Sequence, residues 1–282
     1  SESALESFLE SVHPPGDRSE PPEEFASLNQ PVTERGQALR IALTGLVCLA
    51  VAMGLGRFAF TPIIPMMLRD GLVTLQQASW LASANYLGYL LGALACALQP
   101  WLWARLGWQL APSFAQLIRL GLVSTVVLTL AMTLPLDWTW AWLRFGAGLA
   151  SALVFVYTSG WCLSQLGRLG RPQWAGAIYA GPGAGIMVSG LTVSPMVASH
   201  WASSWAWLSM AALAVLGTAL AWSALGGPQA HLERLSRAQP SGPTSDVTAH
   251  GLGEQALTVT AYGLAGFGYI ISATFLPVIA RQ

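Results

Sequence analysis

A long apolar run with one arginine near its centre places the strongest constraint on how this chain can fold. The run covers residues 41–71 and contains no acidic residue before Asp70. It is longer than the ~20 residues that an α-helix needs to cross ~30 Å of hydrocarbon. At 1.5 Å per residue, Arg57 lies about 18 Å from Arg69 and about 25 Å from Arg40, near the bilayer centre. A guanidinium facing lipid there costs at least ~2.5 to 3.5 kcal/mol, so we expect Arg57 to face protein or a wet cavity.

The composition extends this conclusion to the rest of the chain. Hydrophobic residues make up 54% of the sequence and charged residues 9%, whereas soluble domains carry about 25% charge. Six further apolar runs follow the first, each long enough to cross a bilayer. The predicted spans are residues 41–67, 78–100, 112–134, 139–164, 174–198, 203–225 and 256–279. The fold class predicted is an all-α polytopic membrane protein.

The chain divides into four segments of different composition. Residues 1–38 are predicted to form a disordered, acidic cytoplasmic tail, because the first 34 residues hold eight acids and five prolines. Residues 39–225 hold a six-helix transmembrane bundle. Residues 226–255 are rich in Pro, Ser and Gly, which is typical of a linker. Residues 256–282 are predicted to form a seventh transmembrane helix that starts a second bundle.

Arginines gather on one side of the predicted bundle. They are Arg35, Arg40, Arg105, Arg168, Arg171, Arg234 and Arg237. Because positive residues are retained on the cytoplasmic side, this side and the N-terminus are expected to be cytoplasmic. The predicted location is the cell (inner) membrane, with several passes through it.

Several function classes are disfavoured by the same sequence. The thirteen basic residues are balanced by thirteen acids, so nothing indicates a nucleic-acid partner. No predicted span contains Asp, Glu or His, and the three cysteines lie in separate places in the spans. We therefore expect no metal and no cofactor, and no intramembrane enzyme, which would need convergent acid–base groups, nucleophiles or metal ligands. The spans also offer no side chain that exchanges a proton near neutral pH.

The first two spans carry the most distinctive stretch. Residues 54–94, GLGRFAFTPIIPMMLRDGLVTLQQASWLASANYLGYLLGAL, resemble YbfB/YjiJ-type members of the major facilitator superfamily (MFS). GLGRFAF at 54–60 is also similar to GLAGFGY at 263–269, which favours a second, parallel half. The resemblance implies a transporter of twelve helices, with a substrate cavity between two six-helix halves. With seven predicted spans, the sequence is expected to be truncated after the first helix of the second half.

Candidate substrate-binding residues lie on spans one, two and four. They are Arg57, Thr61, Asn85, Tyr89 and Arg144. Residues four apart share a helix face, which pairs Arg57 with Thr61 and Asn85 with Tyr89. Structural alternatives remain open. Arg57 could instead donate to backbone carbonyls of a neighbouring helix in a purely structural role. The Asn85 amide could hydrogen-bond to a neighbouring helix. Arg144 could extend toward the membrane surface or pair with Asp137.

A second set of residues concerns helix packing and conformational change. They are Gly88 and Gly92 on span two, and Gly181, Pro182 and Gly185 on span five. A stripe of small residues lets helices approach closely. The span-five set resembles the glycine–proline motif of proton-coupled drug exporters in the superfamily, although Ile186 replaces a second glycine. The motif implies a bendable helix, and the resemblance favours export over import.

Together these features predict a secondary active or facilitative transporter that works by alternating access. Its solute would be a small organic molecule, and an anion if Arg57 binds it. The lipid bilayer and this solute are the expected partners. The alternative is a non-transporting membrane assembly or sensor subunit, in which the acidic N-terminal tail docks a protein partner.

Overall fold

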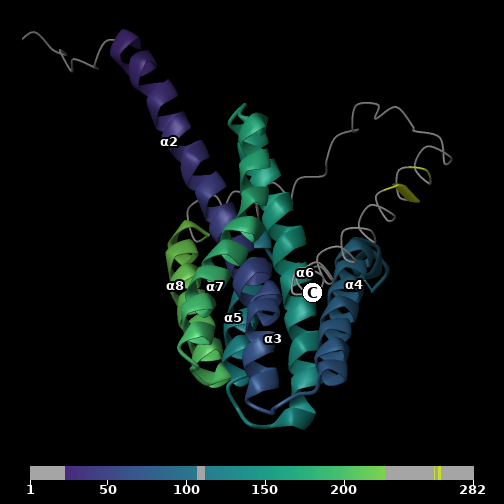
Figure 1. Cartoon of the computed structure of the whole chain (residues 1–282). Coiled ribbons are helices and arrows are strands. Elements are labelled where there is room, and N and C mark those ends of the chain that lie inside the picture. The colour runs from purple at the N-terminus through teal and green to yellow at the C-terminus, as the bar shows by residue number, and fades with distance from the viewer. Residues whose placement is uncertain (1–22, 107–111, 226–256, 258–259, 262–282) are drawn as a thin grey trace, which may run out of the picture. The chain divides into compact units, whose positions relative to one another are not determined.

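The computed structural model describes residues 23–106, 112–225, 257 and 260–261. Every element in these residues is helical (Figure 1). The elements are α2 (Glu23–Leu49), η1 (Ala50–Phe58), α3 (Phe60–Arg69), α4 (Leu75–Leu106), α5 (Phe114–Ala131), α6 (Asp137–Arg168), η2 (Pro172–Tyr179), α7 (Ala180–Ala198) and α8 (Ser203–Ala224). The predicted fold class, an all-α polytopic membrane protein, is confirmed.

Six helical segments in the described part are long and apolar enough to cross a membrane. They are Arg35–Arg69, Leu75–Gln99, Phe114–Ala131, Asp137–Arg168, Pro172–Ala198 and Ser203–Ala224. These match the first six predicted spans in order. The predicted linker, residues 226–255, lies outside the described residues, and so does nearly all of the predicted seventh span, residues 256–279.

Helix α2 begins at Glu23, inside the segment that we expected to be a disordered tail through residue 38. Residues 1–22 of the predicted tail lie outside the described residues.

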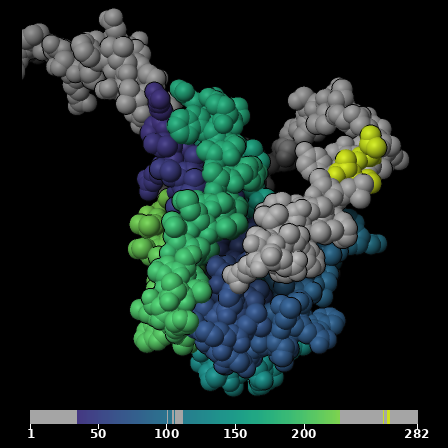
Figure 2. Space-filling model, in the orientation of Figure 1, coloured from purple at the N-terminus to yellow at the C-terminus, as the bar shows by residue number. Residues whose placement is uncertain are grey.

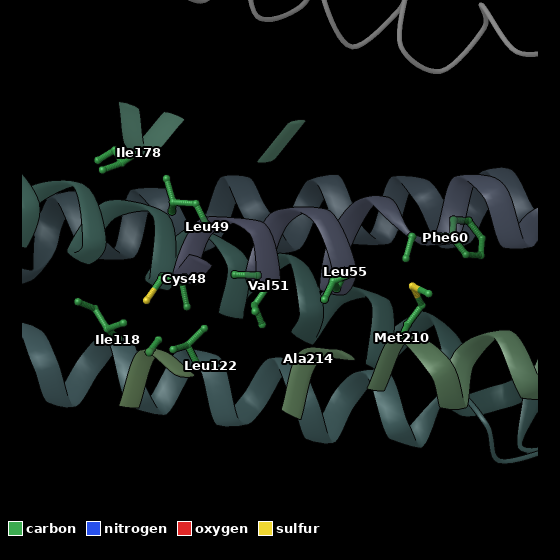
Figure 3. Packing of buried hydrophobic residues seen from close by; sticks show 14 of the residues in the cluster. Cys48, Leu49, Val51, Leu55, Phe60, Ile118, Leu122, Ile178, Met210 and Ala214 are labelled. Carbon is green, nitrogen blue, oxygen red and sulfur yellow. The ribbon is translucent and has the colours of Figure 1, made fainter. Parts of the chain in front are cut away.

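The first span is the most enclosed helix of the bundle. Its most apolar window is 67% buried, whereas the value for the span Leu75–Gln99 is 28%. The span consists of the end of α2, then η1 and α3, and it contacts α5, α6, α7 and α8. Figure 3 shows Val51 and Leu55 of η1 facing the side where Leu122 of α5 and Met210 of α8 lie. The other spans are therefore arranged around the segment that carries Arg57.

Glycines bring the backbones of α4 and α6 close together. Gly88 of α4 lies against the Phe145 carbonyl, and Gly148 of α6 lies against the Asn85 carbonyl. A Cβ atom at either glycine would overlap the opposing backbone, so only glycine permits this approach. Gly92 is also tight, since a Cβ atom there would come within 2.9 Å of the Ala152 Cβ.

A second close contact joins η1 to α7. Helix α7 also lies beside α3, on the face seen in Figure 2. Gly185 lies against the Ala50 carbonyl, and a Cβ atom there would come within 2.7 Å of the Gly54 Cα. Gly181 lies against the Leu46 carbonyl. Pro182, which we expected in a bendable helix, is the third residue of α7. At that position its missing N–H costs no helical hydrogen bond, so it starts the helix after the 3₁₀-helical segment η2.

Candidate functional site

Arg57 lies inside the bundle and is enclosed by aromatic rings. Its side chain is only 6% exposed. The guanidinium carbon Cζ is 4.0 Å from the ring centre of Tyr89 and 5.1 Å from that of Tyr86, both on α4. It is also 5.2 Å from the ring centre of Phe58, the next residue. Each ring face attracts a cation, which offsets part of the cost of removing the charge from water.

The helix around Arg57 is wider than an α-helix. Residues Ala50–Phe58 form π-helical turns, and a turn at Ala59 separates them from α3. Gly54 and Gly56 favour this geometry because they lack the Cβ atoms that would meet α7 and Thr125. Pro62 has no N–H to donate to the carbonyls one helical turn earlier, in either α or π geometry. Backbone acceptors are thus left open just after the arginine.

Arg144 of α6 supplies donors to these carbonyls. Its Nη1 donates to the Gly56 carbonyl at 3.1 Å and its Nη2 to the Arg57 carbonyl at 2.8 Å. Its Cζ lies 4.7 Å from the ring centre of Phe60, and the residue is 2% exposed. Arg144 therefore neither reaches outward to the membrane surface nor takes Asp137 as its hydrogen-bond partner here. Its bond to the Arg57 carbonyl supplies a donor that Pro62 cannot offer in π geometry, and its second bond goes to the carbonyl one residue earlier.

Asn85 links the same region to α4. Its Nδ2 donates to the Arg144 carbonyl at 2.8 Å, and the side chain is buried. The close approach of α4 and α6 at Gly88 and Gly148 makes this reach possible. A series of contacts therefore links α4, α6 and η1. Asn85 of α4 binds α6, Arg144 of α6 binds η1, and Arg57 of η1 lies over the tyrosine rings of α4.

We call this group the arginine cluster. Its members are Arg57, Asn85, Tyr86, Tyr89 and Arg144. Two of them are arginines, which stay protonated in proteins, and the others are neutral. The sequence contains only two acids between residues 35 and 232, Asp70 and Asp137, and both lie at helix ends. A buried site of positive charge within the membrane is by default a functional candidate.

The structure thus gathers four of the five predicted substrate-binding residues. Thr61 is the exception, because it is exposed on α3 rather than enclosed with the others. Our sequence analysis missed Tyr86 and the ring of Phe60. A signal for Tyr86 existed, since it lies three residues before Tyr89 and residues so spaced share a helix face. Nothing in the sequence alone could show that Phe60 meets Arg144.

A separate polar contact joins the end of α3 to the start of α8. Arg69 Nη2 lies 3.0 Å from Asp70 Oδ1, and the Ser203 backbone N–H donates to Asp70 Oδ2 at 2.7 Å. Partial burial raises the pKa of the Asp70 carboxyl, but the hydrogen bonds from Ser203 and Arg69 outweigh this and lower the pKa below its ordinary 3.8. Asp70 is therefore ionised at neutral pH.

Comparison with known proteins gives one match. A family model described as "Uncharacterised MFS-type transporter YbfB" matches residues 49–282, which include the whole arginine cluster. No curated protein and no solved structure matches the chain.

Proposed function

Because the chain belongs to the YbfB family of MFS-type transporters and is a membrane transporter, we propose that it carries a small organic anion by alternating access. One observation supports the anion above all. Two buried arginines, Arg57 and Arg144, lie together, and the spans that carry them contain one acid, Asp137, which is the first residue of α6. An anionic solute at this site would offset a charge that the spans themselves do not balance.

In this proposal Arg57 and Tyr89 contact the solute. A guanidinium presents a planar set of donors that matches a carboxylate through two parallel hydrogen bonds. The rings of Tyr86 and Tyr89 hold the guanidinium in place and keep water away from it. Electrostatic contacts strengthen when water is excluded.

Arg144 and Asn85 act on the solute through Arg57. Arg144 donates hydrogen bonds to two backbone carbonyls of η1, and one of them is the carbonyl of Arg57 itself. Asn85 in turn binds the backbone of Arg144. These contacts fix the wide turns of η1 and so fix where the Arg57 side chain begins.

We further propose that transport is facilitative or is an exchange of solutes, with export as the favoured direction. No side chain in the six spans titrates near neutral pH, apart from groups at helix ends. Asp70 is unsuited to carrying protons, because its lowered pKa keeps it ionised. The similarity of Gly181, Pro182 and Gly185 to an exporter motif supports the direction.

Replacing Arg57 tests the proposal. Purified protein is reconstituted into liposomes. The liposomes are loaded with one of a panel of ¹⁴C-labelled carboxylates, from lactate to benzoate. Arg57→Ala should lower the exchange rate at least about tenfold, because a charge-assisted hydrogen bond contributes roughly 1.5 to 3 kcal/mol. Arg57→Lys keeps the charge but loses the planar set of donors. Its exchange rate should therefore fall between those of the wild type and Arg57→Ala.

Arg119→Ala is the matched control. Arg119 Nη2 also donates to a backbone carbonyl, that of Trp222, but it joins α5 to α8 and is not part of the arginine cluster. Its exchange rate should match that of the wild type. Unchanged exchange in a folded Arg57→Ala protein would contradict the proposal. A wild-type protein that moves no carboxylate would instead favour a non-transporting assembly or sensor subunit.

A further inference from the structure

A cavity of about 300 Å³ is lined by residues at the start of α4 and the start of α6, and none of them belongs to the arginine cluster. Three indole rings and one acid line it. The polar and aromatic lining residues are Gln77, Trp80, Asp137, Trp138 and Trp140. We call it the tryptophan cavity. Leu72, Val73, Leu81 and Ala141 also line it, and Asp137 is the one charged residue among the described residues of the lining.

The local hydrogen bonds hold this lining in place. At the start of α4, Thr74 Oγ1 accepts from the Gln77 N–H at 3.2 Å, and the Thr74 N–H donates to Gln77 Oε1 at 2.8 Å. The Trp140 Nε1 donates to the Leu134 carbonyl at 3.1 Å. Asp137 Oδ1 accepts from the Trp138 N–H at 2.8 Å. Some backbone N–H groups at both helix starts therefore already donate hydrogen bonds to nearby side chains.

The charge of the lining selects the kind of ligand. Helix N-termini attract anions, but here the Asp137 carboxylate already supplies a negative charge at the start of α6. Aromatic faces combined with a carboxylate are the chemistry that recognises organic ammonium groups. Trp138 is 73% exposed and Trp80 68% exposed, so both rings are available to a ligand. Asp137 also stabilises the start of α6, and its carboxylate adds a negative charge beside these rings.

The neighbouring cavity has a different character. It measures about 390 Å³ and shares Leu72 and Trp140 with the tryptophan cavity. Its acid, Asp70, forms an ion pair with Arg69 and accepts a hydrogen bond from Ser203. In the part of the chain that the structure describes, no basic residue lines the tryptophan cavity, so these residues do not balance the Asp137 charge.

We propose that the tryptophan cavity binds an organic ammonium group, carried either by a free quaternary amine or by the headgroup of a zwitterionic lipid. The ammonium lies against the faces of Trp80 and Trp138, with Trp140 as the inner wall, and Asp137 supplies the opposite charge. This site is independent of the anion proposed at Arg57, because the two attract ligands of opposite charge through different residues.

Calorimetric titration of the purified full-length protein with tetramethylammonium chloride tests the proposal, in a maltoside detergent that has no ammonium group. We expect saturable binding. Asp137→Asn should weaken it at least about tenfold, because an ionic contact to a cation is lost. Asparagine still accepts the Trp138 hydrogen bond, so the start of α6 is preserved. Trp138→Leu should weaken binding to a similar degree.

Trp142→Leu is the matched control. Trp142 lies one turn further along α6 and is 72% exposed, but it does not line the cavity. Its affinity should equal that of the wild type. 3,3-Dimethylbutan-1-ol, a neutral analogue of choline, should bind at least about tenfold more weakly than choline if the charge is recognised.

Nanodiscs of two compositions distinguish the sources of the ammonium group. If phosphatidylethanolamine nanodiscs suppress tetramethylammonium binding and phosphatidylglycerol nanodiscs do not, the ligand is a lipid headgroup. Equal binding in both identifies a free cation. The proposal is overturned if the wild type shows no binding, if Asp137→Asn binds as tightly as the wild type, or if Trp142→Leu matches Trp138→Leu.

Discussion

Arg57 and Arg144 are both buried arginines on membrane-spanning helices, but their surroundings differ. Arg144 donates to two backbone carbonyls, whereas Arg57 lies over the rings of Tyr86 and Tyr89. The sequence left both residues with a binding role and a structural alternative. For Arg144 the contacts are those of the structural alternative, because both hydrogen bonds go to backbone carbonyls of η1, whereas the solute-binding role of Arg57 stays a prediction.

At the residue scale, Arg144→Met should destabilise the bundle. The substitution removes two hydrogen bonds from a charged donor, each of which contributes roughly 1.5 to 3 kcal/mol. For a bundle of this size we expect the melting temperature to fall on the order of 5 to 10 °C. Thermal unfolding in detergent measures this change. The melting temperature of Arg144→Lys should lie between those of Arg144→Met and the wild type. A melting temperature equal to that of wild type would show that the two hydrogen bonds contribute nothing.

Asp70 gives a prediction about pH. Its pKa is lower in the folded protein than its ordinary 3.8. Its contribution to stability is therefore fully present above the unfolded pKa and is lost as the pH falls through the lower, folded value. The difference in melting temperature between wild type and Asp70→Asn should be constant from pH 7 to about 5 and shrink below about 4. A difference that grows on acidification would contradict the assigned direction of the shift.

At the scale of elements, η1 shows what a helical pattern leaves open. The apolar run correctly predicts a helix through Arg57, but the widening to π-helical turns over Ala50–Phe58 comes from elsewhere. Gly185 of α7 lies against the Ala50 carbonyl, and Arg144 holds the carbonyls at the other end. Both are contacts with helices more than eighty residues further along the chain. Local sequence cannot reveal them.

Two glycines of α7 provide a matched test of this packing. A Cβ atom at Gly185 would overlap the Ala50 carbonyl, whereas at Gly183 it would meet nothing within 4 Å. Gly185→Ala should therefore lower the melting temperature by several degrees, since overpacking typically costs 1 to 3 kcal/mol. Gly183→Ala should leave it unchanged or raise it slightly, because alanine favours helix. Equal effects of the two substitutions would contradict a close contact at Gly185.

At the scale of the whole molecule, the chain divides into two units, and the first is Ser1–Arg234. All the helices described above belong to the first. Their order and the distribution of arginine support our proposal that the N-terminus is cytoplasmic. If so, the turn between α7 and α8 faces outward and the segment η2 faces the cytoplasm.

Thiol labelling tests this orientation. The native cysteines, Cys48, Cys96 and Cys162, are buried and are first replaced by alanine. A membrane-impermeant maleimide added to intact cells should then label Ser199→Cys and not Gln173→Cys, since both positions are exposed but lie on opposite sides. Labelling of Gln173→Cys alone would invert the proposed topology.

The sequence by itself determined how many of the described helices are long and apolar enough to cross a membrane, and their order. It could do so because the bilayer fixes span length and demands that each span satisfy its own backbone hydrogen bonds. Only the tertiary structure decided which side chains meet. Arg144 reaches the carbonyls beside Pro62, Arg57 lies over the tyrosine rings of α4, and three tryptophans surround a cavity with Asp137. Those contacts depend on how helices distant in sequence pack against one another, and hydropathy does not encode that packing.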